Sequence, residues 1–285
     1  MTHQSHENSA RAESSTFQTG AQALPIEPGR LLFPPVMNGY AQWGKQGFNI
    51  CGGTEKDRLY HIDIHSGYSR SGPLGSRPGV VLHQGMDTKT PILAAAGYDS
   101  QFSARLYSFN NQTAVLMPSL LPAAERTSEF DTEQMPATVR GEQVVFSFFV
   151  EVDHGKERER QKFEWRKFEK GKIATATEGG FELVRVLSPC SPNAGQEEPG
   201  ASSASLSTVD GEENEEVVAL LIWRKLWPTF KHNFTLQLLG KGQTGELGDR
   251  WALMVVITAI RIWALRVNGK TKKGVIATGQ KLATP

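Results

Sequence analysis

The stretch that decides the fold is WALMVVITAIRIWAL, residues 251–265. Arg261 is its only charged residue, so a helix built from it is apolar on every side and must be enclosed all round. Asp249 can cap the start of such a helix, and Gly269 follows its end. A helix of this length spans about 22 Å, whereas a bilayer core needs about 20 residues. We therefore favour a helix enclosed by protein over a transmembrane span, which Arg261 would also make more costly.

Upstream of this helix, the sequence consists largely of short strand-like runs. Residues 59–65 alternate in character, with Tyr60, Ile62 and Ile64 on one face, as in a half-buried strand. Strands at regular spacing, with few helical patterns among them, indicate an antiparallel sandwich or barrel. A closed barrel would supply the apolar walls that the helix needs and would leave no sheet edge unpaired. The other strand-like runs are 80–82, 91–98, 103–109, 113–117, 143–152, 161–168, 181–187, 217–226 and 233–239.

Composition and charge limit the classes of function. The chain has 285 residues with 31 basic and 30 acidic side chains, a balance that gives no general attraction to nucleic acids. Its 39% hydrophobic residues exclude a wholly disordered chain. Two cysteines are too few for a disulfide framework, and residues 1–22 lack a secretory signal pattern. We therefore expect a cytoplasmic protein, located peripherally at membranes if it binds lipid.

The domain organisation follows from shifts in composition. Residues 1–45 begin with a polar stretch and are expected to form a disordered or extended tail. Residues 46–268 are expected to form the barrel, with its central helix at about 249–268. The insertion at about 188–215 is rich in serine and acidic residues, which predicts a disordered loop. Residues 269–285 contain basic but no acidic residues and are expected to form a basic C-terminal tail.

Five short stretches carry a resemblance to a known fold. They are LYHID at 59–63, VLHQG at 81–85, FEWR at 163–166, FELV at 181–184 and TGELGDRW at 244–251. In this order, and followed by the apolar helix, they resemble the tubby C-terminal-like fold of tubby-like proteins, phospholipid scramblases and the LURP-one-related family. The likeness covers most of residues 58–266 and is greatest to a fungal group of uncharacterised tubby-like proteins.

The resemblance implies a mainly β fold, a closed antiparallel barrel of about twelve strands around a central, buried C-terminal helix. It does not transfer a ligand site, because the C-terminal signature of classical tubby proteins is missing. A scramblase calcium segment and a palmitoylated cysteine cluster are missing as well.

Basic residues gather in one predicted hairpin, residues 156–172, beside Trp165 and Phe168. Its second strand places Phe163, Trp165 and Lys167 on one face, against Glu164, Arg166 and Phe168 on the other. The hairpin could bind anionic lipid or phosphoinositide head groups. The alternative is a solvated strand pair whose cations are balanced by the interleaved glutamates. The candidate ligand-binding residues are Lys162, Arg166, Lys167 and Lys170.

Two further motifs receive a structural interpretation. GKGQTG at 240–245 fits a dinucleotide-binding pattern, but no acidic residue lies about 20 residues further on, so we interpret it as a strand-to-helix turn. His61, Asp63 and His65 share one strand face, with His83 on the next run. Successive residues on such a face lie about 7 Å apart, too far for one metal ion. We expect a solvent-facing polar face there, and no metal, cofactor or catalytic residue.

These features favour a non-enzymatic tubby-like binding module for anionic lipid or phosphoinositide head groups. One alternative is a scramblase-like membrane protein whose apolar helix enters the bilayer. Another is a protein-interaction scaffold that uses the acidic insertion. The expected partners are thus an anionic membrane lipid or another protein, and not a nucleic acid.

Overall fold

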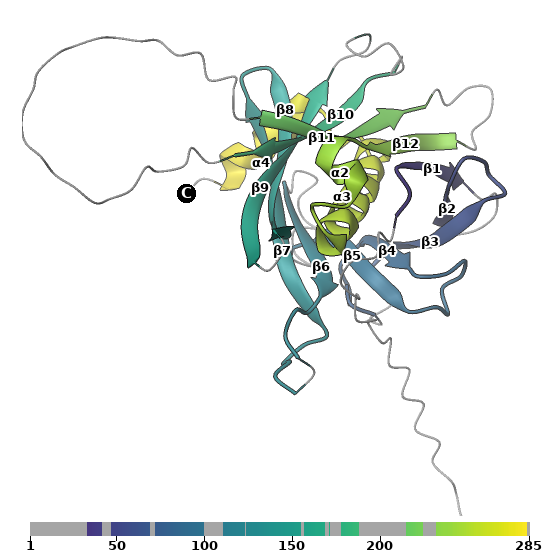
Figure 1. Ribbon diagram of the computed structural model, residues 1–285. Helices are drawn as coiled ribbons and strands as arrows, with labels where there is room; N and C mark the ends of the chain where they lie inside the picture. Colours follow the sequence, from purple (N-terminus) through teal and green to yellow (C-terminus); the bar gives the residue numbers. More distant parts are fainter. Residues whose placement is uncertain are drawn as a thin grey trace, which may run out of the picture.

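The computed structural model describes residues 33–41, 47–68, 72–99, 111–122, 124–154, 157–168, 171, 178–187, 215–224 and 232–283. In these residues, twelve strands form one closed barrel, and helices follow in the C-terminal part (Figure 1). The strands are β1 (Val36–Ala41), β2 (Gly47–Cys51), β3 (Arg58–His65), β4 (Gly79–His83), β5 (Ile92–Tyr98), β6 (Gln112–Pro118), β7 (Phe130–Arg140), β8 (Gln143–His154), β9 (Glu157–Phe168), β10 (Gly180–Val186), β11 (Glu215–Trp223) and β12 (His232–Leu238). The helices are α2 (Gly240–Thr244), α3 (Asp249–Val267) and α4 (Lys273–Ala283).

The barrel is an antiparallel meander. Each strand pairs with its neighbours in sequence, and β1 closes the sheet against β12. In that closing pair, Val36 lies opposite Gln237 and Tyr40 lies opposite His232. Closure leaves the sheet without an unpaired edge that could recruit another chain. The predicted mainly β fold with a closed antiparallel barrel is therefore confirmed.

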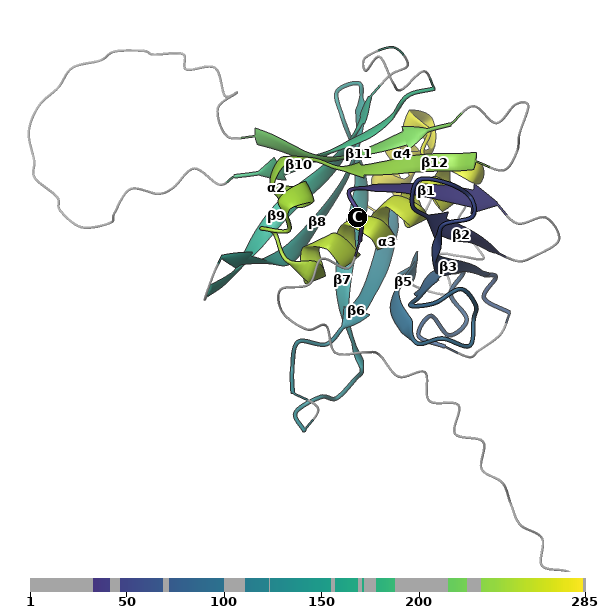
Figure 2. The same ribbon diagram turned by 45° about the vertical axis from the view of Figure 1, so that its right-hand side comes forward.

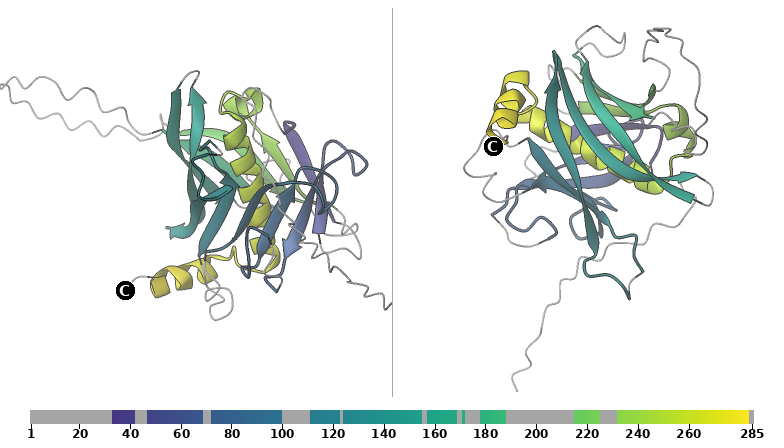
Figure 3. Two further views of the ribbon diagram at one scale, coloured as in Figure 1. Left: turned by 90° about the horizontal axis from the view of Figure 1, so that it is seen from below. Right: turned by 90° about the vertical axis from the view of Figure 1, so that its left-hand side faces the viewer.

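Helix α3 contributes many residues to the main hydrophobic core. Fifteen of its nineteen residues are buried, and it packs against β4, β5, β6, β8 and β12. Figures 2 and 3 show strands on opposite sides of this helix. The indole Nε1 of Trp165 on β9 donates a hydrogen bond of 3.0 Å to the hydroxyl of Thr258. Both side chains are fully buried, so this bond satisfies a polar group that would otherwise be costly in the core. In the described residues, no helix combines the length and apolar character that crossing a membrane requires.

Both predicted tails contain elements of the fold. The N-terminal tail, residues 1–45, includes β1, whose Met37 is buried in the core. The C-terminal tail, residues 269–285, includes α4, whose Ile276 is buried and whose Gln280 accepts a hydrogen bond of 2.9 Å from the Val139 amide. The predicted insertion ends one residue too late, because Glu215 already begins β11. Sequence reasoning did not place these two segments in the barrel, because polar residues surround their short apolar runs.

Other segments also differ from the sequence prediction or lie outside the described residues. Strands β2 and β7 were not predicted, and β7 shows mostly half-buried residues and contains Pro136, which weakens its strand pattern. The predicted strand at 103–109 and the bulk of the insertion, 188–214, lie outside the described residues. The GKGQTG segment forms the short helix α2 between β12 and α3. A Cβ at Gly242 would come within 2.4 Å of the Trp251 ring, so this glycine is required for close packing.

Candidate ligand-binding face on β9

Strand β9 divides the predicted basic cluster between two faces. Phe163 and Trp165 point into the core and are completely buried. Lys167 shares their alternation and lies opposite the buried Phe181, so it belongs to the inner face at the end of the strand. Lys162 and Arg166 lie on the outer face, whereas Lys170 lies outside the described residues. The structure therefore brings only two of the four candidates together.

Glu164 is the centre of the outer face. Its carboxylate is 1% exposed and lies 2.8 Å from the ammonium of Lys162 and 2.9 Å from the guanidinium of Arg166. Arg140, at the end of β7, approaches the same carboxylate at 2.9 Å. Arg166 also reaches Glu215 at the start of β11, through two hydrogen bonds of 2.6 Å. We call Arg140, Lys162, Glu164, Arg166 and Glu215 the β9 face.

The β9 face has more cations than carboxylates. Among these five residues, three basic side chains meet two acidic ones, an excess of one cation before Glu182 is counted, which lies opposite Arg166 on β10. Arg140 is 52% exposed and Lys162 is 33% exposed, so both can meet a ligand from solvent. Sequence reasoning missed Arg140, because the strand that carries it was not recognised and lies two strands away from β9. No local signal in the sequence connects these positions.

The cations keep the carboxylates of this face ionised. Burial opposes ionisation of Glu164, but hydrogen bonds from Lys162, Arg166 and Arg140 outweigh it and hold its pKa below the usual value. Hydrogen bonding to Arg166 lowers the pKa of Glu215 in the same way. The same two carboxylates raise the pKa of Arg166. The face is therefore a set of fixed charges at neutral pH.

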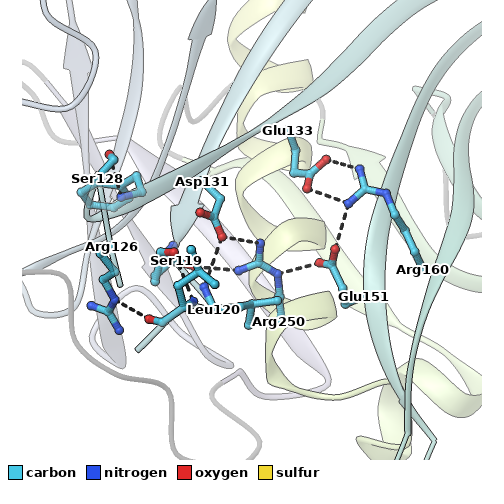
Figure 4. Close-up of polar contacts among 12 residues, drawn as sticks. Ser119, Leu120, Arg126, Ser128, Asp131, Glu133, Glu151, Arg160 and Arg250 are labelled. Atoms are coloured by element: carbon cyan, nitrogen blue, oxygen red, sulfur yellow. Dashed lines mark hydrogen bonds and ion pairs between the residues drawn. The ribbon is translucent and has the colours of Figure 1, made fainter. Parts of the chain in front are cut away.

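A second charged network occupies the other end of β9 (Figure 4). Arg160 contacts Glu133 at 2.5 Å and Glu151 at 2.8 Å. Arg250, in the first turn of α3, donates to the other oxygen of Glu151 at 2.8 Å and to the Pro118 carbonyl at 2.6 Å. Through these contacts, the first turn of α3 binds β6 and β8, and Glu151 links it further to β9. Asp131 also lies 3.6 Å from Arg250, so three carboxylates meet two arginines and no cation is in excess. The network therefore has a structural role.

The remaining chemical candidates are part of the barrel. His61 is 7% exposed, and its Nδ1 lies 3.1 Å from the Asn49 side-chain oxygen, so the prediction that it faces solvent was wrong. Within the described part of the chain, no group of three or more His, Cys, Asp or Glu is arranged to hold a metal ion. The thiol of Cys51 is buried, and burial raises its pKa to about 11, which makes it a poor nucleophile at neutral pH.

Comparison of the chain with protein-family models, curated proteins and solved structures finds no match. We therefore infer the function from the geometry of the β9 face.

Proposed function

We propose that this protein is a non-enzymatic binding module whose β9 face takes anionic lipid head groups, phosphoinositides among them. The observation that carries the proposal is the excess of cations around Glu164. Arg140, Lys162 and Arg166 all lie within 2.9 Å of this single buried carboxylate. A phosphate beside them would complete the charge balance that the protein itself leaves open.

The geometry of the face suits a phosphate group. The ion pairs with Glu164 hold three long side chains in place, which reduces the entropy that a ligand would otherwise lose in ordering them. Guanidinium groups bind phosphate oxygens through paired hydrogen bonds, and two of the three cations are arginines. Glu215 is 42% exposed, so a phosphate can compete with it for Arg166. Each basic residue close to an anionic membrane contributes about 1 kcal/mol to binding.

We also infer that α3 is the central, buried helix of a tubby-like barrel. Its fifteen buried residues, its contacts with five strands and the Trp165–Thr258 hydrogen bond support this arrangement. Amide hydrogen exchange tests it, because an enclosed helix opens only when the barrel unfolds. We expect α3 amides to exchange as slowly as those of β8, and exchange much faster than in β8 would contradict the inference.

The two alternatives have less support in the described residues. A scramblase-like role requires α3 to exchange its contacts with the barrel for lipid. A scaffold role rests on the acidic insertion, which lies outside the described residues at 188–214. We therefore retain anionic lipid binding as the proposed function.

Vesicle co-sedimentation tests the proposed function directly. The double variant Arg140→Gln/Lys162→Gln removes two exposed cations and leaves Arg166 to pair with Glu164. Two lost contacts of about 1 kcal/mol each predict about 30-fold weaker partitioning onto phosphatidylcholine vesicles that contain a phosphoinositide. Vesicles of phosphatidylcholine alone should bind neither protein.

The matched control is Lys56→Gln/Lys89→Gln. Both lysines are exposed, and they lie in the β2–β3 and β4–β5 turns, across the barrel from β9. This variant loses the same charge and should bind like the wild type. Equal partitioning of the wild type and the β9-face variant would remove the proposal.

A further inference from the structure

The connection between β6 and β7 carries exposed apolar side chains just past the end of β6. Leu120 and Leu121 are 42% and 48% exposed, and Pro122, which follows them, is exposed as well. Figures 1 and 2 show this connection projecting beyond the barrel wall. Natural proteins avoid a run of exposed consecutive apolar residues unless another molecule covers it. The run therefore indicates an interaction surface.

Hydrogen bonds hold the two leucines in place (Figure 4). The Leu120 amide donates to the Asp131 carboxylate at 3.2 Å, and the Leu121 amide donates to the Ser119 hydroxyl at 3.3 Å. The Nε atom of Arg126 donates to the Leu121 carbonyl at 2.6 Å, which places a cation beside the leucines. Binding therefore costs little entropy in ordering this segment. We call Leu120, Leu121 and Arg126 the leucine knob.

A groove of matching character lies beside the start of β1. Its volume is about 590 Å³, within the range of about 300–1,000 Å³ of pockets that hold organic ligands. Val36 and Leu59 are among the apolar residues that line it, and Gly52 and Gly53 of the β2–β3 turn line it as well. Asp57 supplies a carboxylate, and a Cβ at Gly52 would collide with that carboxylate, so the glycine gives it room. We call this lining the β1–β3 groove.

The knob and the groove are complementary in polarity and charge. Each combines apolar residues with one charged group, the Arg126 guanidinium in the knob and the Asp57 carboxylate in the groove. Among the ion pairs of the described residues, none includes either group. Contact between the two surfaces would pair both charges and cover the leucines. Neighbouring charges suit this contact too, because Glu125 precedes Arg126, and Lys56 and Arg58 flank Asp57.

Both surfaces lie at the same end of the barrel. Successive connections of an antiparallel meander alternate between its two ends, so the start of β1, the β2–β3 turn and the β6–β7 connection share one end. Two copies that meet through this end can each insert a knob into the other's groove, as the twofold symmetry of common dimers requires. We propose that the leucine knob of one copy docks in the β1–β3 groove of a second copy. This self-association is separate from the β9 face and does not depend on its function.

Sedimentation velocity over a range of protein concentrations tests the proposal. We expect the wild type to shift from monomer to dimer as its concentration rises. Leu120→Ser/Leu121→Ser should raise the dissociation constant at least about tenfold, because apolar side chains are lost from the contact. The matched control, Tyr68→Ser/Met86→Ser, removes two other exposed apolar side chains and should associate like the wild type. A wild type that stays monomeric up to about 1 mM, or a knob variant that associates equally well, would overturn the proposal.

A groove variant makes the test independent of the knob. A Cβ at Gly53 meets no atom within 4 Å, so Gly53→Gln can occupy the groove without disturbing the fold. We expect it to weaken association at least about tenfold, as the knob variant does. Gly274→Gln, at an equally open position in α4, is the control and should leave association unchanged. Unchanged association of Gly53→Gln would show that the groove does not receive the knob.

Mixing the two variants decides whether knob and groove meet each other. The knob variant keeps an intact groove and Gly53→Gln keeps an intact knob, so their mixture should associate more strongly than either variant alone. A mixture no stronger than its components would contradict the proposed contact. Binding of the wild type to phosphatidylcholine vesicles that is lost in the knob variant, without self-association, would assign the leucines to a bilayer and overturn the proposal.

Discussion

Glu164 shows how a single carboxylate organises the surface of β9. It is 1% exposed and lies between Arg140, Lys162 and Arg166. Removing one partner of a buried charge cluster leaves the others unpaired, which costs about 3 kcal/mol. We therefore expect Glu164→Gln to lower the free energy of unfolding at pH 7 by about 3 kcal/mol, as measured by urea denaturation.

The same residue predicts a dependence of stability on pH. The pKa of Glu164 is lowered in the folded protein, so its contribution is fully present above the pKa of the unfolded chain and is lost as pH falls through the folded value. Wild-type stability should therefore decrease as pH falls below about 4.3, the usual pKa of glutamate. Glu164→Gln should lose less stability over this interval.

A surface glutamate provides the control for both measurements. Glu125 is exposed in the loop between β6 and β7, and Glu125→Gln should match the wild type at every pH. If Glu164→Gln has the wild-type stability at pH 7 and a parallel pH profile, the cations do not depend on this carboxylate.

At the residue scale, the sequence predicts well which face of a strand a side chain occupies. It predicts less well which side chains from different strands come into contact. Alternation correctly places Phe163, Trp165 and Lys167 on one face of β9 and Arg166 on the other. The same pattern could not reveal Arg140, because its approach to Glu164 depends on how strands fold around the barrel. Nor could it show that Arg261 lies under Tyr98, since that contact joins two distant segments.

At the scale of elements, α4 is the clearest departure from the sequence prediction. Basic residues and threonines surround its few apolar positions, so the segment reads as a tail. Ile276 is nevertheless 3% exposed and belongs to the main core, and Gln280 binds the backbone of β7. The helix therefore covers part of the barrel.

Substitution of Ile276 measures what α4 contributes. A buried isoleucine replaced by alanine loses transfer free energy and leaves a cavity, so Ile276→Ala should reduce the free energy of unfolding by about 2–5 kcal/mol. Leu282, in the same helix, is 64% exposed, and Leu282→Ala should change stability by less than about 0.5 kcal/mol. Equal effects of the two variants in urea denaturation would show that α4 does not pack on the barrel.

Strong periodicity decided which elements could be predicted. The stretch at 251–265 and the strand at 143–152 stand out because apolar residues occupy most of their positions. Strand β7 has charged and polar residues at half-buried positions, since arginines from other elements cover its Asp131 and Glu133. Its pattern makes sense only when those partners are present.

At the scale of the whole molecule, the pairing of consecutive strands explains why a nearly neutral chain has a charged face. The strands that carry the β9 face are β7, β9 and β11, which are not neighbours in the sheet but are linked through β8 and β10. Their charged residues are dispersed along the sequence from 140 to 215. The near-equality of basic and acidic residues in the whole chain therefore does not describe the local charge.

The central claim is that the net positive charge of the β9 face binds anionic head groups. Glu215→Gln tests it most directly, because it frees Arg166 and adds one net positive charge without disturbing Glu164. One additional charge predicts about fivefold stronger co-sedimentation with phosphoinositide vesicles, whereas Glu246→Gln, an exposed carboxylate lost beside α2, should not change it. Unchanged or weaker sedimentation of Glu215→Gln would contradict the claim.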